Sequence, residues 1–122
     1  MQEQTNRMIV QKQSDVTIVE LMDKKILDES SITRLTEDLN QITDQDLSPR
    51  MILDFTNVAH MSSSALSMLI SLHKRVREKK GVLRLCNIRP TIFEVFKITR
   101  LNEVFGISSS RDDAVHDVLK GK

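Results

Sequence analysis

Three consecutive serines, Ser62, Ser63 and Ser64, are the residues of this 122-residue chain best placed to do chemistry. They follow an apolar run that leads to Asp54, and an apolar helical pattern begins directly after them. A serine at such a place caps a helix, because its hydroxyl accepts a backbone N–H of the first turn. One cap needs one serine, so the pattern leaves at least one hydroxyl for another role.

The neighbours of these serines do not predict a catalytic nucleophile. A nucleophile elbow needs Gly-x-Ser-x-Gly, because glycine permits the strained turn from strand to helix, and no glycine flanks residues 62–64. Ser71 and Lys74 match Ser-x-x-Lys, but two fixed residues without the companion motifs often occur by chance. Without an assembled nucleophile, base and oxyanion set, we predict that the chain is not an enzyme.

The sequence also lacks the patterns that hold metals and cofactors. His60, His73 and His116 are scattered and have no metal-ligand spacing. The chain has three glycines and neither of the glycine-rich loops that bind nucleotide phosphates. Cys86 alternates with apolar residues, which favours a small buried side chain. We therefore predict no metal and no cofactor.

Residues 73–80 form a basic run, yet the whole chain has 18 Lys and Arg against 17 Asp and Glu. With a net charge of +1 and no Trp or Tyr to stack bases, nucleic acid is not a predicted partner. The run is either a solvated helix end or a patch for an acidic protein partner.

No apolar stretch approaches the ~20 residues that span a bilayer, and no signal peptide is evident. We expect a cytoplasmic protein without membrane insertion.

Apolar spacing predicts the elements that position the serines. Two β-prone runs, 8–10 and 16–21, flank a turn at residues 14–15 and predict a hairpin. Helices are predicted over 29–44, from the serines to Gly81, from Pro90, and from Ser110. Strands at 51–55, 82–86 and 104–107 alternate with them, which implies parallel strands joined by right-handed crossovers.

The predicted fold class is therefore α/β. It has a small mixed β-sheet, with an N-terminal antiparallel hairpin plus parallel strands, and about four α-helices. Hydrophobic residues make up 39% and charged residues 29% of the chain, a globular balance. The length predicts a single domain over 1–122, with an ordered core of about 8–119 and a frayed polar segment at 1–6.

The segment from Asp54 to Leu66 resembles the signature loop of the STAS domain, the fold of bacterial anti-sigma factor antagonists. That pattern is an Asp after a strand, an apolar loop, and then Asp-Ser-Ser/Thr-Gly/Ala-Leu at a helix start. The matching positions are Asp54, Val58, Met61, Ser63, Ser64, Ala65 and Leu66. Residues 26–28, 95–105 and 110–114 resemble further parts of the family, so the resemblance covers about 8–119.

The chain departs from the family pattern at two positions. Ser62 stands where the family has an acidic residue before the phosphate acceptor, a departure that bears on kinase recognition. Arg100 stands where a glycine is usual before the position of Leu101. That position is a helix end, where a residue other than glycine is strained.

The resemblance implies an anti-sigma factor antagonist, whose dephosphorylated form binds an anti-sigma factor and thereby releases a sigma factor. In that scheme the anti-sigma factor is also an ATP-dependent serine kinase, and a serine phosphatase reverses the modification. Alignment of the motif gives Ser63 as the acceptor, with Ser64 as the runner-up and Ser62 as the helix cap. The predicted partner-binding residues, taken from their positions in the loop and on the next helix, are Val58, His60, Met61, Ser62, Ser64 and Ser67, with His73 further along.

A second function stays open at this level. STAS modules also serve as accessory parts of transporters and signalling scaffolds. In such a module the serines would be structural caps, and the partner would be bound constitutively. Loss of the usual acidic residue at Ser62 favours this alternative, whereas the run of three serines favours the phosphorylated switch.

Overall fold

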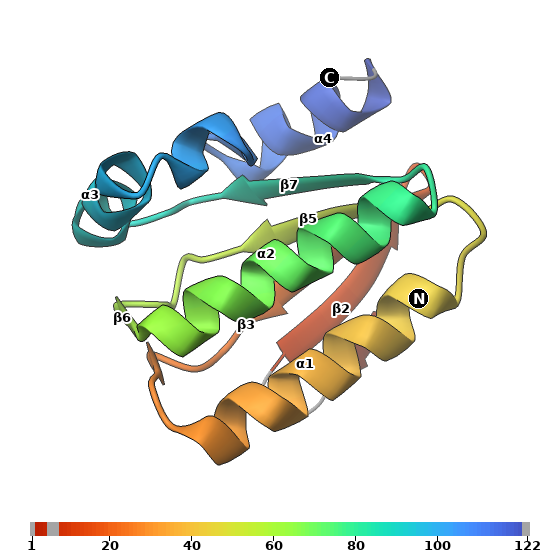
Figure 1. Cartoon of the computed structure of the whole chain (residues 1–122). Helices are drawn as coiled ribbons and strands as arrows, with labels where there is room; N and C mark the ends of the chain where they lie inside the picture. Colours follow the sequence, from red (N-terminus) through yellow and green to blue (C-terminus); the bar gives the residue numbers. More distant parts are fainter. Residues whose placement is uncertain (1, 5–7, 121–122) are drawn as a thin grey trace.

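The computed structural model describes residues 2–4 and 8–120 and contains a six-stranded mixed sheet (Figure 1). The strands lie in the order β1-β2-β3-β5-β7-β8. Their bounds are β1 Gln2–Gln4, β2 Met8–Gln13, β3 Val16–Leu21, β5 Arg50–Asp54, β7 Val82–Cys86 and β8 Gly106–Ser108. The first three strands pair antiparallel, and β3, β5, β7 and β8 run parallel. The predicted mixed sheet is confirmed.

The N-terminal hairpin has a two-residue turn. Gln13 pairs with Val16, and Ser14 and Asp15 between them have φ values of 53° and 66°. Two residues at positive φ match the turn geometry that suits the right-handed twist of a hairpin. The strand Gln2–Gln4 was not predicted; it pairs antiparallel with β2 where the sequence suggests a frayed polar segment.

The described residues form four α-helices, as predicted. They are α1 Glu29–Asp44, α2 Ser63–Glu78, α3 Pro90–Ile98 and α4 Arg111–Leu119. α1 and α2 lie side by side on one face, and α4 packs on the other, against β3, β5, β7 and β8 (Figure 1). None of these helices is both long enough and apolar enough to cross a membrane.

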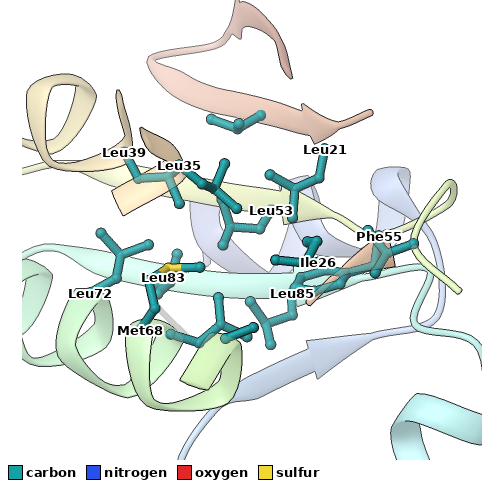
Figure 2. Close-up of a cluster of buried hydrophobic side chains, with 14 of the residues drawn as sticks. Leu21, Ile26, Leu35, Leu39, Leu53, Phe55, Met68, Leu72, Leu83 and Leu85 are labelled. Atoms are coloured by element: carbon teal, nitrogen blue, oxygen red, sulfur yellow. The ribbon is translucent and has the colours of Figure 1, made fainter. Parts of the chain in front are cut away.

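Each face of the sheet has its own apolar core. Leu35, Leu39, Leu53, Leu72 and Leu83 are among the side chains buried between α1, α2 and the sheet (Figure 2). The core under α4 consists of Val16, Ile18, Ile52, Cys86, Ala114, Val115 and Val118. β5 contributes to both cores, because successive side chains of a strand point to opposite faces. This explains why residues 51–53 are apolar in succession, without a polar residue at alternate positions.

The second helix ends differently from the prediction. The helix was predicted to end at Gly81; its last helical residue is Glu78, and Lys80, with φ 59°, is the left-handed residue that follows. The Gly81 N–H donates to the Val76 carbonyl and the Lys80 N–H to Arg77, both at 2.9 Å, the paired bonds of a Schellman motif. Gly81 is needed for space instead, because a Cβ there would lie 2.2 Å from the Pro49 carbonyl oxygen.

The last predicted strand is shifted along the chain. Leu101–Glu103 forms a 3₁₀ turn and the strand is Gly106–Ser108, rather than 104–107. Phe105 lies before the strand and is buried against Phe96, at 5.9 Å between ring centroids. Its apolar character therefore reflects core packing and not strand pairing. The burial predicted for Cys86 is confirmed, and that burial raises the pKa of its thiol to about 12.

Candidate functional site

The loop between β5 and α2 is held by a short pair of strands at its end. β4 (Lys25–Ile26) and β6 (His60–Met61) pair in parallel as a separate two-stranded ribbon. The N–H groups of Ala59 and His60 both donate to the Lys24 carbonyl, at 2.8 and 3.1 Å. These bonds fix the backbone that delivers the chain to the three serines.

The three serines occupy the first turn of α2 in different ways. Ser62 is the N-cap, and its Oγ accepts the Ala65 N–H at 3.2 Å. Its own N–H donates to the Ile26 carbonyl at 3.0 Å. Ser63 and Ser64 are the first two helical residues, and both are exposed. The N-cap position predicted for Ser62 is confirmed.

The other predicted partner-binding residues fall into two groups. Ser67 is exposed one turn after Ser63 in α2, and His60 and Met61 of β6 directly precede the serines, His60 exposed and Met61 half-buried. Val58 is completely buried in the core beside Phe55, and its N–H donates to the Phe55 carbonyl at 3.0 Å. Its side chain shapes the loop from inside and is not available for direct contact.

His73 is half-buried further along α2. It lies edge-on to Phe105, with 5.1 Å between ring centroids, and its Nδ1 is buried without a hydrogen bond in the described structure. Burial, and then the charge of Arg77, lower its pKa. In the basic run, Arg75 and Lys79 pair with Asp44 of α1, so part of the positive charge is neutralised within the fold.

A buried carboxylate stands at the beginning of the site loop. Asp54 is 2% exposed, and its Oδ1 accepts hydrogen bonds from Thr56 Oγ1 at 2.6 Å and Asn87 Nδ2 at 3.1 Å. Its Oδ2 accepts from Arg111 Nε and Nη2, at 3.1 and 2.8 Å. Burial by itself raises the pKa of Asp54, but these hydrogen bonds outweigh it and lower the pKa below 3.8.

The network extends from Asp54 to a second carboxylate. Arg111 at the start of α4 also pairs with Glu20 of β3, at 3.3 Å, and Asn57 Nδ2 donates to Glu20 Oε2 at 3.0 Å. Sequence reasoning found Asp54 but missed Glu20 and Arg111, because their meeting depends on the order of strands in the sheet. An arginine in the first turn of a helix, where cations are disfavoured, was the available signal.

A sequence model of the STAS domain matches residues 7–114, so the chain belongs to the STAS family. A protein of Bordetella bronchiseptica, BtrV, whose name marks it as a candidate anti-sigma factor antagonist, is 32% identical over 65 residues. That match spans 53% of this chain and 56% of the relative. The family predicted from the serine segment is confirmed.

Solved structures share the fold at low sequence identity. An anti-sigma-factor antagonist (STAS) domain protein from Planctomyces limnophilus aligns with a TM-score of 0.84 at 21% identity, over 92% of this chain and 97% of that one. The Bacillus cell fate determinant SpoIIAA in its phosphorylated form aligns with a TM-score of 0.67 at 15% identity, over 91% of this chain and 98% of that one. The murine anion transporter Slc26a9 aligns with a TM-score of 0.77 at 18% identity. The aligned region covers 90% of this chain and 18% of the transporter.

Proposed function

We propose that this chain is an anti-sigma factor antagonist that a partner kinase switches off by phosphorylating Ser63. The observation that carries the proposal is the position of Ser63, exposed in the first turn of α2 directly after a separate cap residue. A kinase can reach its hydroxyl without breaking the cap. The names of BtrV and of the Planctomyces protein support the partner class, an anti-sigma factor.

The helix start makes the modification compatible with the fold. A phosphate at a helix N-terminus meets free N–H groups and the positive end of the dipole. It adds a charge of about −1.5 to −2 on the docking surface. Opposing a like charge in an interface costs several kcal/mol, and ~4 kcal/mol is about a thousandfold in affinity. The switch therefore needs no large conformational change.

Ser62 caps α2, which is the structural role that an acidic residue at this position would have. Serine and aspartate are similarly good N-caps, so the helix start survives the departure from the family pattern. The charge next to the acceptor is lost. We propose that the partner kinase recognises an uncharged residue there, and that a cytoplasmic serine phosphatase restores the binding form.

The test measures binding and modification together. Candidate anti-sigma kinases from the same genome would be titrated with the wild type and with Ser63→Glu. The matched control is Ser71→Glu, at an exposed serine of α2 outside the predicted partner-binding residues. We expect Ser63→Glu to weaken binding at least ~100-fold and mass spectrometry to find phosphate on Ser63. Phosphate that remains after Ser63→Ala, on Ser64, would contradict the assigned acceptor.

The likeness to Slc26a9 favours a second candidate, an accessory module of a transporter or scaffold. In this role the partner is bound constitutively, and the serines only begin the helix. Equal capture of a transporter or scaffold component by the wild type and by Ser63→Glu would support this function and overturn the switch.

A further inference from the structure

A pocket of about 400 Å³ opens beside the serine loop, between the β4–β6 ribbon, the first turns of α2, and α3. Figure 1 shows β6, the start of α2 and α3 at the same end of the molecule. The apolar wall of the pocket includes Leu27, Met61, Leu66, Ile92 and Val95. Leu27 is 48% and Val95 40% exposed, so apolar surface is open to solvent here. Exposed apolar surface in a concave site is typical of binding.

Part of the pocket wall belongs to the start of the helix that carries Ser63. Met61 precedes the cap residue Ser62, and Leu66 is the fourth helical residue. Residues at these two positions form the hydrophobic staple that sets how the chain enters a helix. A side chain bound in the pocket therefore contacts the same turn that presents Ser63.

Two basic side chains line the pocket beside this apolar wall. Lys25 of β4 and His60 of β6 are register partners in the parallel ribbon, so they are direct neighbours on one face. Both are exposed, and neither forms an ion pair within the described part of the chain. The acidic residues next to the lining are engaged elsewhere, because Asp28 caps α1 and Glu94 pairs with Lys97.

We propose that this pocket binds the protein partner through an apolar side chain that has an acidic residue beside it. The apolar side chain enters between Leu66 and Val95, and the carboxylate meets Lys25 and His60. The inference rests on the proposed function for the class of partner and adds the chemistry of recognition. It also gives the phosphate a physical effect, because a phosphorylated Ser63 would repel an acidic segment held next to it.

The test uses a display library of linear peptides, about 12 residues long, screened on the full unphosphorylated chain. We expect enrichment of peptides with a large apolar residue within two positions of Asp or Glu. We expect Lys25→Glu and Val95→Lys each to lower the affinity for the most enriched peptide at least ~tenfold. Both changed residues are exposed, and circular dichroism would check that the variants fold.

Lys74→Glu is the matched control, since Lys74 is an exposed cation on α2 outside the pocket. It should leave peptide affinity within about twofold, while raising the salt from about 50 to 500 mM should weaken binding by screening. No enrichment, enrichment of basic peptides, or an equal loss with Lys74→Glu would overturn the proposal. The screen needs no kinase and no phosphate, so its failure is separate from failure of the Ser63 switch.

Discussion

Asp54 ties three segments of the chain to the start of the candidate site. Its hydrogen-bond donors are Thr56 in the loop, Asn87 after β7, and Arg111 at the start of α4. A buried carboxylate is tolerated when it is paired and hydrogen-bonded, and leaving it short of partners is costly. The network therefore holds the origin of the loop that leads to Ser63.

Replacing Arg111 with Leu should destabilise the fold, because the carboxylates of Asp54 and Glu20 lose their cationic partner. We expect a loss of about 2 kcal/mol in the free energy of unfolding at pH 7, measured with urea, because Asp54 keeps only its uncharged donors. Lys120→Leu changes an exposed cation at the end of the same helix and should alter stability by less than about 0.5 kcal/mol. Equal effects of the two changes would contradict the role of the network.

The lowered pKa of Asp54 makes its stabilising effect depend on pH. A carboxyl group with a folded-state pKa below its ordinary 3.8 stabilises the fold above that value. The benefit is lost as the pH falls through the lowered pKa. We expect the stability difference between wild type and Asp54→Asn to be constant from about pH 7 to 5 and to shrink below about pH 4. A difference that grows on acidification would be inconsistent with this sign.

At the scale of the element, the start of α2 separates the structural serine from the exposed ones. Ser62 caps the helix and Met61 and Leu66 flank it, while Ser63 takes no part in the cap hydrogen bond. The helix start can therefore be tested apart from the proposed modification.

Removing the cap hydroxyl should cost stability where removing the proposed acceptor should not. We expect Ser62→Ala to lower the free energy of unfolding by about 1 kcal/mol, because the Ala65 N–H loses its acceptor. Ser63→Ala should stay within about 0.5 kcal/mol of the wild type. Thermal unfolding of both variants measures this, and the reverse order would overturn the assignment of the cap.

The end of α3 is strained, as the departure from the family pattern predicted. Arg100 has φ 62° and ψ 18°, a left-handed conformation that glycine adopts without steric cost. Arg100→Gly should therefore stabilise the fold by about 1 kcal/mol in urea unfolding. Thr99, one residue earlier, has φ −89°, so Thr99→Gly should destabilise. Stabilisation by both changes would point to a cause other than the left-handed conformation.

At the scale of the whole molecule, the end of α2 packs against the connection between α1 and β5. The Val82 N–H donates to the Pro49 carbonyl at 2.8 Å, and Ser48 Oγ donates to the Lys80 carbonyl at 3.0 Å. This contact joins segments more than 30 residues apart and aligns the edges of β5 and β7. It requires backbone to approach backbone at Gly81.

Gly81→Ala should lower stability even though it removes a flexible residue. The added Cβ would meet the Pro49 carbonyl oxygen at 2.2 Å, so the two segments must separate. We expect a loss of about 1–3 kcal/mol in urea unfolding. Lys80→Gly should instead stabilise by up to about 1 kcal/mol, because Lys80 holds the left-handed conformation. If Gly81→Ala were neutral, the close approach would be relaxed in solution.

The sequence by itself determined the order and type of most elements and the start of the candidate site. The helix over 29–44, the strand over 82–86, the helix from Pro90 and the serine cap were all predicted at their observed positions. These features are local: apolar spacing, proline geometry and cap chemistry act within a few residues. The STAS resemblance likewise rested on short motifs, the segment from Asp54 to Leu66 and three further stretches, read in their order along the chain.

Tertiary structure decided the features that depend on residues distant in the chain. It brought Arg111 to Asp54 and Glu20, buried Val58, and set Lys25 beside His60. It also moved the last strand to Gly106–Ser108, because the apolar Phe105 is used in the core. Contacts of this kind follow from strand order and packing across the sheet, which short-range patterns do not encode.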